Sequence, residues 1–102
     1  MDECYIDIWR NNRPVSAIEI ARKITSNDHN KLSNLAVLNS LSKRSNAAGL
    51  RAGFLCAAPE VILSYSMIAA NGLALVPTPL LNVAGEIYRD LEHNKMARAH
   101  YD

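Results

Sequence analysis

The residues with the clearest chemical potential are two hydroxyls, an ammonium group and a guanidinium group that lie close together in the sequence, at Ser40, Ser42, Lys43 and Arg51. They favour a phosphate pocket, because Arg51 can donate two parallel hydrogen bonds to phosphate oxygens and each serine can add one. Neighbouring cations and partial burial would favour the neutral amine of Lys43, the form that attacks carbonyl carbon. A solvated loop that binds no ligand explains the same residues, and spacing alone favours that simpler interpretation.

Patterns of apolar residues predict the elements that would position these side chains in the first half of the chain. Tyr5–Trp9 alternates polar and apolar residues, which predicts a short strand. Ser16 and Glu19 form a capping box, which predicts the start of an amphipathic helix that runs to about Ile24. The continuous apolar run 35–38 predicts a strand buried on both faces of a parallel sheet.

The second half of the chain is predicted to contain one more strand and two helices. Residues 51–57 form the strand, and residues 59–70 form a helix with proline in its first turn. After the break at Pro77–Pro79, a long helix is predicted to begin near Leu81. This order is typical of an α/β fold with a mostly parallel sheet and flanking helices, in which ligands bind at the carboxyl ends of strands.

The composition indicates one small globular domain and argues against two classes of partner. The chain has 102 residues and a formal net charge of +1, with 49% hydrophobic residues. Near-neutral charge gives no electrostatic footprint for nucleic acid or an anionic membrane surface. The uncharged stretch 61–85 is interrupted by polar residues, an Asn-Gly turn and two prolines, so it predicts two buried pieces joined by turns and not a membrane span.

The cysteines and histidines give no sign of a metal site. Cys4 and Cys56 match neither a zinc spacing nor a CxxC redox pair, and the three histidines share no metal-ligand spacing. We therefore expect no bound metal. An acidic start without the layout of a signal peptide, together with two reduced thiols, predicts a cytoplasmic protein, although spacing alone leaves a disulfide open.

Two segments resemble the class I/II aminotransferases, which are pyridoxal-phosphate enzymes of the aspartate aminotransferase fold type (fold type I). Residues 39–46, Asn-Ser-Leu-Ser-Lys-Arg-Ser-Asn, together with Arg51 and Gly53, resemble the cofactor-lysine segment of that family. Residues 2–5, Asp-Glu-Cys-Tyr, resemble the D-E-x-Y segment that lies at the end of a parallel strand about forty residues before the lysine. The wording S-L-S-K-R-S-N is closest to the N-succinyldiaminopimelate aminotransferases of bacterial lysine biosynthesis.

The resemblance implies a role for each of these residues. Lys43 would hold pyridoxal 5'-phosphate as a Schiff base and would then move a proton between substrate and cofactor carbons. Asp2 would pair with the protonated pyridine nitrogen, which keeps the ring an electron sink. Tyr5 would form a hydrogen bond with the phenolic oxygen of the cofactor ring. The residues expected around the phosphate group are Ser40, Ser42 and Arg51.

The resemblance also implies which part of the family fold this sequence contains. Family members are several times longer, so the chain is expected to be a truncated central fragment. Residues 1–80 would form the carboxyl-terminal part of the cofactor-binding large domain, and residues 81–102 a long helix that leads toward a missing small domain. The family active site lies at a dimer interface, which implies a homodimer for any complete version.

Three functions stay open on the sequence alone. The first is an aminotransferase of amino-acid biosynthesis that acts through Lys43 on a small amino donor and a 2-oxo acid acceptor, of the N-succinyldiaminopimelate/2-oxoglutarate type. The second is a non-catalytic truncated remnant, or one half of a split aminotransferase. The third is a phosphate-binding module unrelated to aminotransferases, whose phosphate affinity would not depend on Lys43.

Overall fold

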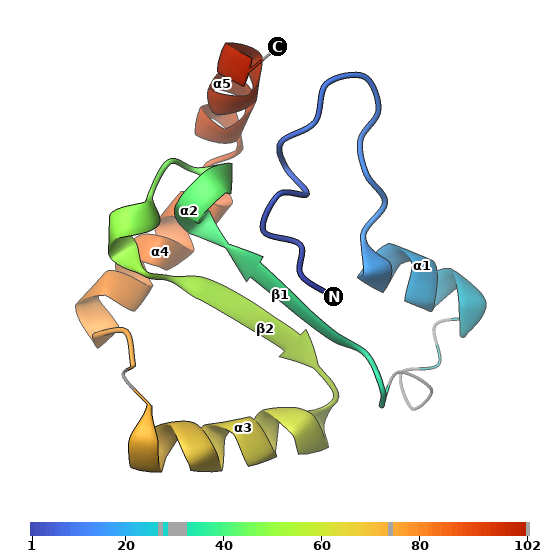
Figure 1. Ribbon diagram of the computed structural model, residues 1–102, viewed down its shortest axis with the longest axis vertical. Helices are drawn as coiled ribbons and strands as arrows, with labels where there is room; N and C mark the ends of the chain where they lie inside the picture. The colour runs from blue at the N-terminus through green and yellow to red at the C-terminus, as the bar shows by residue number, and fades with distance from the viewer. Residues whose placement is uncertain (27, 29–32, 74, 102) are drawn as a thin grey trace.

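The two apolar segments on either side of Lys43 pair with each other as an antiparallel ribbon in the computed structural model (Figure 1). The structure describes residues 1–26, 28, 33–73 and 75–101. Helices lie at both ends of the ribbon. The elements in chain order are α1 (Ala17–Ile24), β1 (Ala36–Ser40), α2 (Leu41–Arg44), a 3₁₀ turn (Ala48–Leu50), β2 (Gly53–Ala57), α3 (Pro59–Gly72), α4 (Thr78–Arg89) and α5 (Leu91–Tyr101).

The prediction of a mostly parallel sheet is wrong for the described residues. β1 and β2 run antiparallel, with Ala36 opposite Ala57 and Ser40 opposite Gly53. The reason lies in the connection between the strands, which contains one short helix and one 3₁₀ turn. A parallel pair would require a crossover that carries the chain back along the whole strand. Here the strands close directly, because the Leu41 N–H donates to the Ala52 carbonyl oxygen at 3.2 Å.

Parallel pairing is limited to the first residues of the chain among the ranges described. Asp2 forms an isolated parallel bridge with Leu38. The Glu3 N–H donates to the Leu38 carbonyl oxygen at 2.8 Å, and the Leu38 N–H donates to the Met1 carbonyl oxygen at 3.0 Å. The segment that resembles D-E-x-Y therefore lies directly beside β1 (Figure 1).

The strand predicted over Tyr5–Trp9 is also wrong, because the chain turns immediately after Glu3. The carbonyl oxygen of Glu3 accepts from the Ile6 N–H at 3.1 Å and from Asn39 Nδ2 at 3.2 Å, so it does not continue the ladder. A second turn follows, closed by a hydrogen bond from the Ile8 N–H to the Tyr5 carbonyl oxygen at 3.0 Å. Residues 3–8 therefore form two successive turns, and residues 5–9 do not form a strand.

Helix α1 confirms the predicted amphipathic helix and its Ser16 cap. The carboxylate that helps to cap it is not the predicted one. Ser16 Oγ accepts a hydrogen bond from an N–H of the first turn. Glu19 pairs with Arg13 at 2.9 Å and so does not complete the predicted capping box. Glu3 takes its place, since Glu3 Oε1 accepts from the Ala17 N–H at 2.7 Å and Glu3 Oε2 accepts from the Ser16 hydroxyl at 3.0 Å. The helix start is thereby tied to the first residues of the chain.

The predicted long helix over residues 81–102 is divided in two at Asp90. This residue has an extended conformation, with φ −76° and ψ 90°. Its N–H donates to the Glu86 carbonyl oxygen at 3.1 Å, and its Oδ1 atom accepts from the His93 N–H at 2.8 Å. Asp90 thus ends α4 and caps α5, which explains why the helical pattern is interrupted at a residue with a short acidic side chain.

The buried side chains are concentrated where α2 packs on α4. The strand β1 and the uncharged stretch 61–85 are more exposed than the sequence predicts. Leu41, Ala52 and Ala84 form the buried cluster. Val37 is fully buried, whereas its neighbour Leu38 is 51% exposed, so β1 is not buried on both faces. The uncharged stretch 61–85 does form separate pieces, in α3 and α4, but both are largely exposed. No helix within the described ranges is long and apolar enough to cross a bilayer.

Gly53 marks the closest approach of β1 and β2. A Cβ atom placed there would clash with the Asn39 carbonyl oxygen of β1. We expect Gly53→Ala to separate the strands beside Ser40 and to lower the free energy of unfolding by about 1–3 kcal/mol. Denaturant titration of this variant against Gly49→Ala measures the effect, because no atom lies within 4 Å of a Cβ at Gly49. Equal stability of the two variants would contradict the close approach.

Candidate functional site

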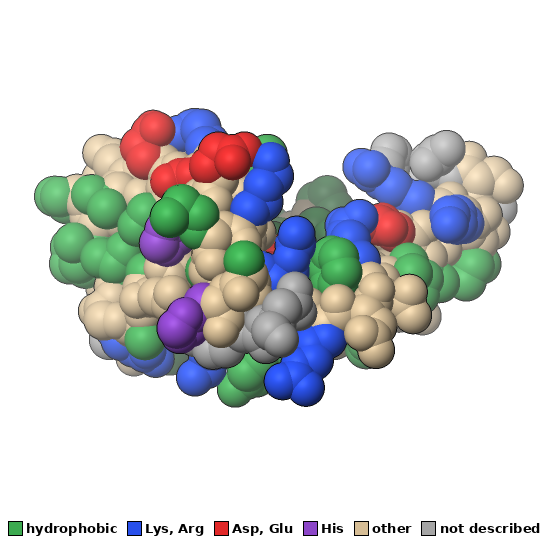
Figure 2. Space-filling view, turned by 90° about the horizontal axis from the view of Figure 1, so that it is seen from above, with side chains coloured by type: hydrophobic (Ala, Val, Ile, Leu, Met, Phe, Trp, Pro, Cys, Tyr) green, Lys and Arg blue, Asp and Glu red, His purple; other side chains and the backbone are tan. Residues whose placement is uncertain are grey.

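The carboxyl end of β1 gathers the residues that the sequence singled out. β1 ends at Ser40, and α2 follows at once with Ser42 and Lys43. Because Gly53 lies opposite Ser40, Arg51 comes to the same end of the ribbon. Seen from above, Lys and Arg side chains flank a hollow between the part of the molecule that carries α1 and the rest (Figure 2).

Lys43 lies beside Tyr5, so the two sequence motifs meet in space. Lys43 Nζ is 5.9 Å from the centroid of the Tyr5 ring, within the range of a cation–π contact. Both side chains are exposed. The expected partial burial of Lys43 is therefore not seen, because α2 presents this side chain outward while Leu41 and Arg44 of the same helix are buried.

The two serines bind each other. Ser40 Oγ accepts from the Ser42 N–H at 3.1 Å and donates to Ser42 Oγ at 3.0 Å. Both residues are half-buried. Since the Ser42 hydroxyl accepts this bond, its own hydrogen remains available to a ligand oxygen.

Arg51 lies at the same end of the ribbon but points elsewhere. It has a left-handed backbone conformation, with φ 53° and ψ 31°, and its Nη1 atom donates to the Ala48 carbonyl oxygen at 3.0 Å. The side chain is exposed and lines two cavities, of about 370 and 270 Å³, that it shares with Leu75 and Val76. Within the described part of the chain, its guanidinium group forms no hydrogen bond with Lys43 or with the two serines.

Asp2 is held in its ionised form by Cys4. Asp2 Oδ1 accepts from the Cys4 N–H at 2.9 Å. A hydrogen bond from the Cys4 thiol, with this backbone bond, lowers the pKa of Asp2 below its ordinary value. The pKa of the Cys4 thiol is raised, first by its hydrogen bond to the Asp2 carboxylate, then by its own burial and by the negative charge of Asp2. The carboxylate is therefore charged at neutral pH.

Asp2→Asn is expected to make Cys4 react faster with iodoacetamide at pH 8. The substitution removes the charged acceptor that raises the pKa of the Cys4 thiol, so the thiolate fraction increases. Mass spectrometry can measure the labelling of Cys4 relative to that of the exposed Cys56, which serves as the internal reference. An unchanged ratio in the variant would show that Asp2 does not control this thiol.

Arg44 anchors the site, a role that the sequence did not reveal. Its side chain is buried, and Nε lies 3.2 Å from Asp7 Oδ2. Its Nη1 and Nη2 atoms donate to the carbonyl oxygens of Ile87 and Tyr88 at 3.2 and 3.1 Å. Arg44 thus joins α2 both to the turn after the D-E-x-Y segment and to α4. One sequence feature could have indicated this role. Arg44 directly follows Lys43 on a helix, and successive side chains of a helix point to different sides, so the two cations could not both face the site.

Tyr88 completes the support of β1 from α4. Its hydroxyl donates to Asn39 Oδ1 at 3.1 Å, and its ring packs on Phe54 with centroids 5.4 Å apart. Burial raises the pKa of Tyr88 above its ordinary value, so the phenol keeps the hydrogen that it donates. Because Asn39 Nδ2 donates to the Glu3 carbonyl oxygen at 3.2 Å, one chain of hydrogen bonds links α4, β1 and the first residues.

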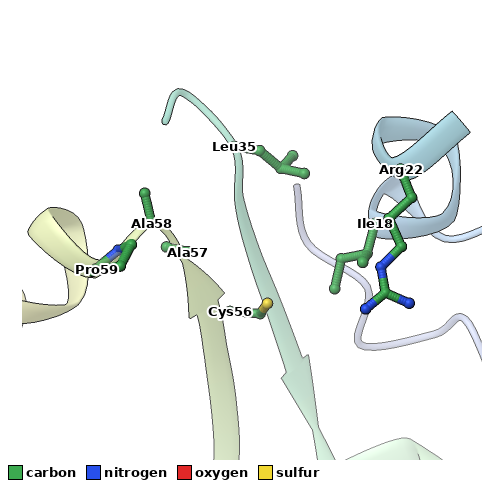
Figure 3. Close-up of a pocket in the computed structure, with 7 residues that line it drawn as sticks. All are labelled: Ile18, Arg22, Leu35, Cys56, Ala57, Ala58 and Pro59. Carbon is green, nitrogen blue, oxygen red and sulfur yellow. The ribbon is translucent and has the colours of Figure 1, made fainter. Parts of the chain in front are cut away.

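A cavity of about 230 Å³ lies away from these residues, between α1 and the end of β2 (Figure 3). Most of its lining is apolar, with one guanidinium group and one thiol. None of the sequence-predicted site residues lines it. In the described part of the chain, no group of three or more His, Cys, Asp or Glu side chains could hold a metal ion. The lining residues are Ile18, Arg22, Leu35, Cys56, Ala57, Ala58 and Pro59.

Comparison with known proteins gives the same family as the two motifs. The family model described as aminotransferase class I and II matches residues 1–101. The 4-dedimethylamino-4-oxo-anhydrotetracycline transaminase of Streptomyces rimosus is 36% identical over 100 residues, covering 98% of this chain and 26% of the relative. A probable aminotransferase of Mycobacterium tuberculosis is 29% identical over 100 residues, covering 98% of this chain and 23% of the relative. The chain spans about a quarter of the length of these relatives. No solved structure matches the chain.

Proposed function

Because the chain belongs to the class I and II aminotransferase family, a family of transferases, we propose that it forms the cofactor-lysine part of a pyridoxal-phosphate-dependent aminotransferase, with Lys43 as the residue that holds the cofactor. One observation carries the proposal: Lys43 Nζ lies 5.9 Å from the centroid of the Tyr5 ring at the carboxyl end of β1, although the two residues come from motifs far apart in the sequence. The simpler alternative, a solvated loop that binds no ligand, gives no reason for the two motifs to meet.

The donor set of the site fits the chemistry of pyridoxal phosphate. An aldehyde is held by an amine, which Lys43 supplies beside the Tyr5 ring. A phosphate is held by hydroxyl and guanidinium donors. Ser42 supplies a hydroxyl beside Lys43 in α2, whereas the Arg51 guanidinium group, at the same end of the ribbon, would have to turn away from the Ala48 carbonyl oxygen to reach the same phosphate. A protonated ring nitrogen pairs with an ionised carboxylate, and Cys4 keeps the pKa of Asp2 low. When bound, the cofactor supplies the electron sink for the reaction.

Each of these side chains has a separate task in the proposed site. Lys43 holds the cofactor and moves a proton with its amine, Asp2 keeps a negative charge next to the ring nitrogen, and Tyr5 supplies a hydroxyl to the ring oxygen. Ser40 orients Ser42 through the hydrogen bond between their hydroxyls. The buried Arg44 positions α2, so it acts through Lys43 and not on the cofactor.

The proposed reaction is transfer of an amino group from a small amino donor to a 2-oxo acid. The sequence motif of residues 40–46 supports N-succinyldiaminopimelate and 2-oxoglutarate as the two substrates. The names of the two relatives do not point to either of these substrates. We further propose that residues 1–80 belong to the cofactor-binding domain, that residues 81–102 lead toward a second domain, and that the complete enzyme is a homodimer.

A titration with pyridoxal phosphate tests the proposal. We expect the chain to develop a visible absorbance band of covalently held cofactor, and Arg51→Ala to weaken binding roughly 10- to 100-fold, because a charge-assisted hydrogen bond contributes about 1.5–3 kcal/mol. The matched control is Arg22→Ala, an exposed arginine of α1, which should titrate like the unmodified chain. A band that is equally strong in Arg51→Ala would contradict the phosphate site.

A further inference from the structure

Glu3 lies between Asp2 and Tyr5 in the D-E-x-Y segment, and it binds two different parts of the molecule. Its N–H donates to the Leu38 carbonyl oxygen at 2.8 Å, and its carbonyl oxygen accepts from Asn39 Nδ2 at 3.2 Å. These bonds fix its backbone along β1. Its carboxylate binds the start of α1, which comes 13 to 14 residues later in the chain. The same residue therefore joins a strand of the site to a helix outside it.

The bonds between the Glu3 carboxylate and α1 are stronger than ordinary capping bonds. Oε1 accepts from the Ala17 N–H at 2.7 Å, and Oε2 accepts from the Ser16 hydroxyl at 3.0 Å. The Ser16 oxygen in turn accepts from the Ile18 N–H at 3.2 Å. Hydrogen bonds to a carboxylate are roughly twice as strong as neutral ones, and the positive end of the helix dipole attracts the same charge. We call the bonds from Ser16 and Ala17 to this carboxylate the Glu3 latch.

The Glu3 latch closes the loop formed by residues 4–15. The chain leaves β1 after Glu3, makes a wide loop and returns at α1 (Figure 1). Surface loops of this kind, whose ends lie close together, often carry function. Without bonds at its base, such a loop gains the freedom to move its ends apart.

Two side chains in the middle of this loop contact helices beyond it. Asp7 Oδ2 lies 3.2 Å from Nε of the buried Arg44 in α2. The centroid of the Trp9 ring lies 4.4 Å from Arg98 Cζ in α5. The loop is therefore held at its middle by α2 and α5, and at its base by the Glu3 latch. Loss of the latch is expected to release the base, while the contacts at the middle limit the change to that part.

Tyr5 is placed by the backbone of this loop more than by its own side chain. The residue is 64% exposed, and within the described residues its hydroxyl forms no hydrogen bond. The contact of its ring with Lys43 Nζ, at 5.9 Å, is weak for exposed groups. The Ile6 N–H donates to the Glu3 carbonyl oxygen at 3.1 Å, so the turn that presents Tyr5 begins at Glu3. A movement of Glu3 is therefore passed directly to Tyr5.

We propose that Glu3 is a positioning residue of the site, because the Glu3 latch holds the base of the loop where Tyr5 meets Lys43. This inference deepens the proposed function and rests on it, since Glu3 acts through its neighbours Asp2 and Tyr5. Glu3 does not act on the cofactor, because both of its carboxylate oxygens bind α1. The proposal also gives α1, which lies outside the site, a part in shaping it.

Trypsin cleavage of the chain without cofactor tests the latch. Arg10 is exposed and lies within the loop, so cleavage after it reports how often the loop opens. We expect Glu3→Ala to increase this rate roughly tenfold or more, because bonds to a charged group are lost. Cleavage after Arg89, whose exposed side chain lies at the end of α4, is the internal reference and should not change.

Nuclear magnetic resonance measures the contact that the latch is proposed to maintain. The Tyr5 ring shifts the resonances of the Lys43 methylene protons, and Tyr5→Leu gives their values without the ring. In Glu3→Ala these resonances should move most of the way to the Tyr5→Leu values. In Glu3→Gln they should move less, because the amide oxygen can still accept from the Ala17 N–H. This graded response separates positioning from a general loss of stability.

Glu19→Ala is the matched control, since Glu19 is a carboxylate of α1 that pairs with the loop residue Arg13 at 2.9 Å. It removes the same charge and another contact between loop and helix, but these side chains are 44% and 63% exposed. Cleavage after Arg10 and the Lys43 resonances should match those of the unmodified chain. Equal behaviour of Glu3→Ala and Glu19→Ala, or unchanged Lys43 resonances in Glu3→Ala, would overturn the proposal. If Glu3→Ala does not unfold cooperatively, Glu3→Gln and Glu19→Gln give the same comparison.

Titration with pyridoxal phosphate separates the latch from the proposed function. Glu3→Ala should weaken cofactor binding, whereas Glu19→Ala should not. Lys43 resonances that move in Glu3→Ala, in a chain that binds no cofactor even when unmodified, would count against the proposed function and leave the latch standing. Cofactor bound equally well by Glu3→Ala and by the unmodified chain would do the reverse.

Discussion

Lys43→Ala is expected to lower amino transfer by at least roughly 10²–10⁴-fold, the contribution of one positioned proton-transfer group. Alanine removes both the amine that would hold the cofactor and the base that would move the proton. The structure supports a local effect, because Lys43 is exposed and its Nζ atom contacts the Tyr5 ring at 5.9 Å. The loss should be measured as kcat in a chimaera in which this chain replaces the matched 100 residues of the Streptomyces rimosus transaminase.

Lys23→Ala is the matched control for this prediction. Lys23 is an exposed lysine in the last turn of α1, so its loss changes the net charge equally without touching α2. Its kcat should equal that of the unmodified protein. Lys43→Ala should also unfold at the same denaturant concentration as Lys23→Ala, since neither side chain is buried. Full activity in Lys43→Ala would remove this residue from the chemistry.

Arg44→Met is expected to give the largest loss of stability, about 3 kcal/mol, because it leaves a partly buried carboxylate and two carbonyl oxygens without their donor. Arg44 is 7% exposed, and its partner Asp7 has a side chain that is 31% exposed. The guanidinium group also bonds the carbonyl oxygens of Ile87 and Tyr88. For a small domain such a loss is a large share of the free energy of unfolding. The midpoint of denaturant unfolding measures it.

Arg89→Met is the matched control, because it removes an ion pair that is exposed and not buried. Arg89 and Glu86 pair at 2.6 Å, but their side chains are 73% and 77% exposed. Exposed pairs contribute about 0–1 kcal/mol, so this variant should remain close to the unmodified chain. Adding Asp7→Asn to Arg44→Met should recover part of the stability, because the unpaired carboxylate is then removed. Equal losses in the two arginine variants would contradict the anchoring role of Arg44.

Most local sequence signals predicted local structure, although the alternation at Tyr5–Trp9 predicted a strand where the chain forms turns. The Ser16 cap predicted the start of α1, Pro59 predicted the start of α3, and the apolar runs around Lys43 predicted two strands. The family was also available from the sequence, because the two motifs contain unusual combinations of residues at fixed spacing. These features depend on neighbouring residues, so the sequence alone determines them.

Features that depend on distant residues were not predictable in the same way. The apolar run 35–38 does not specify whether its partner strand is parallel, and here the short connection between β1 and β2 decides it. The role of Arg44 depends on Asp7, which precedes it by 37 residues, and on Ile87 and Tyr88 of α4, which follow it by 43 and 44 residues. The exposure of α3 could not be foreseen either, since an apolar uncharged helix normally indicates burial.

The central claim is that the amine of Lys43 holds pyridoxal phosphate, and peptide mapping after borohydride reduction tests it most directly. The chain has four lysines, at positions 23, 31, 43 and 95. With cofactor in less than equimolar amount, the account predicts that the reduced adduct appears on Lys43 well before it appears on the other three. An adduct spread evenly over the four lysines of the folded chain, or missing from Lys43, would contradict the account.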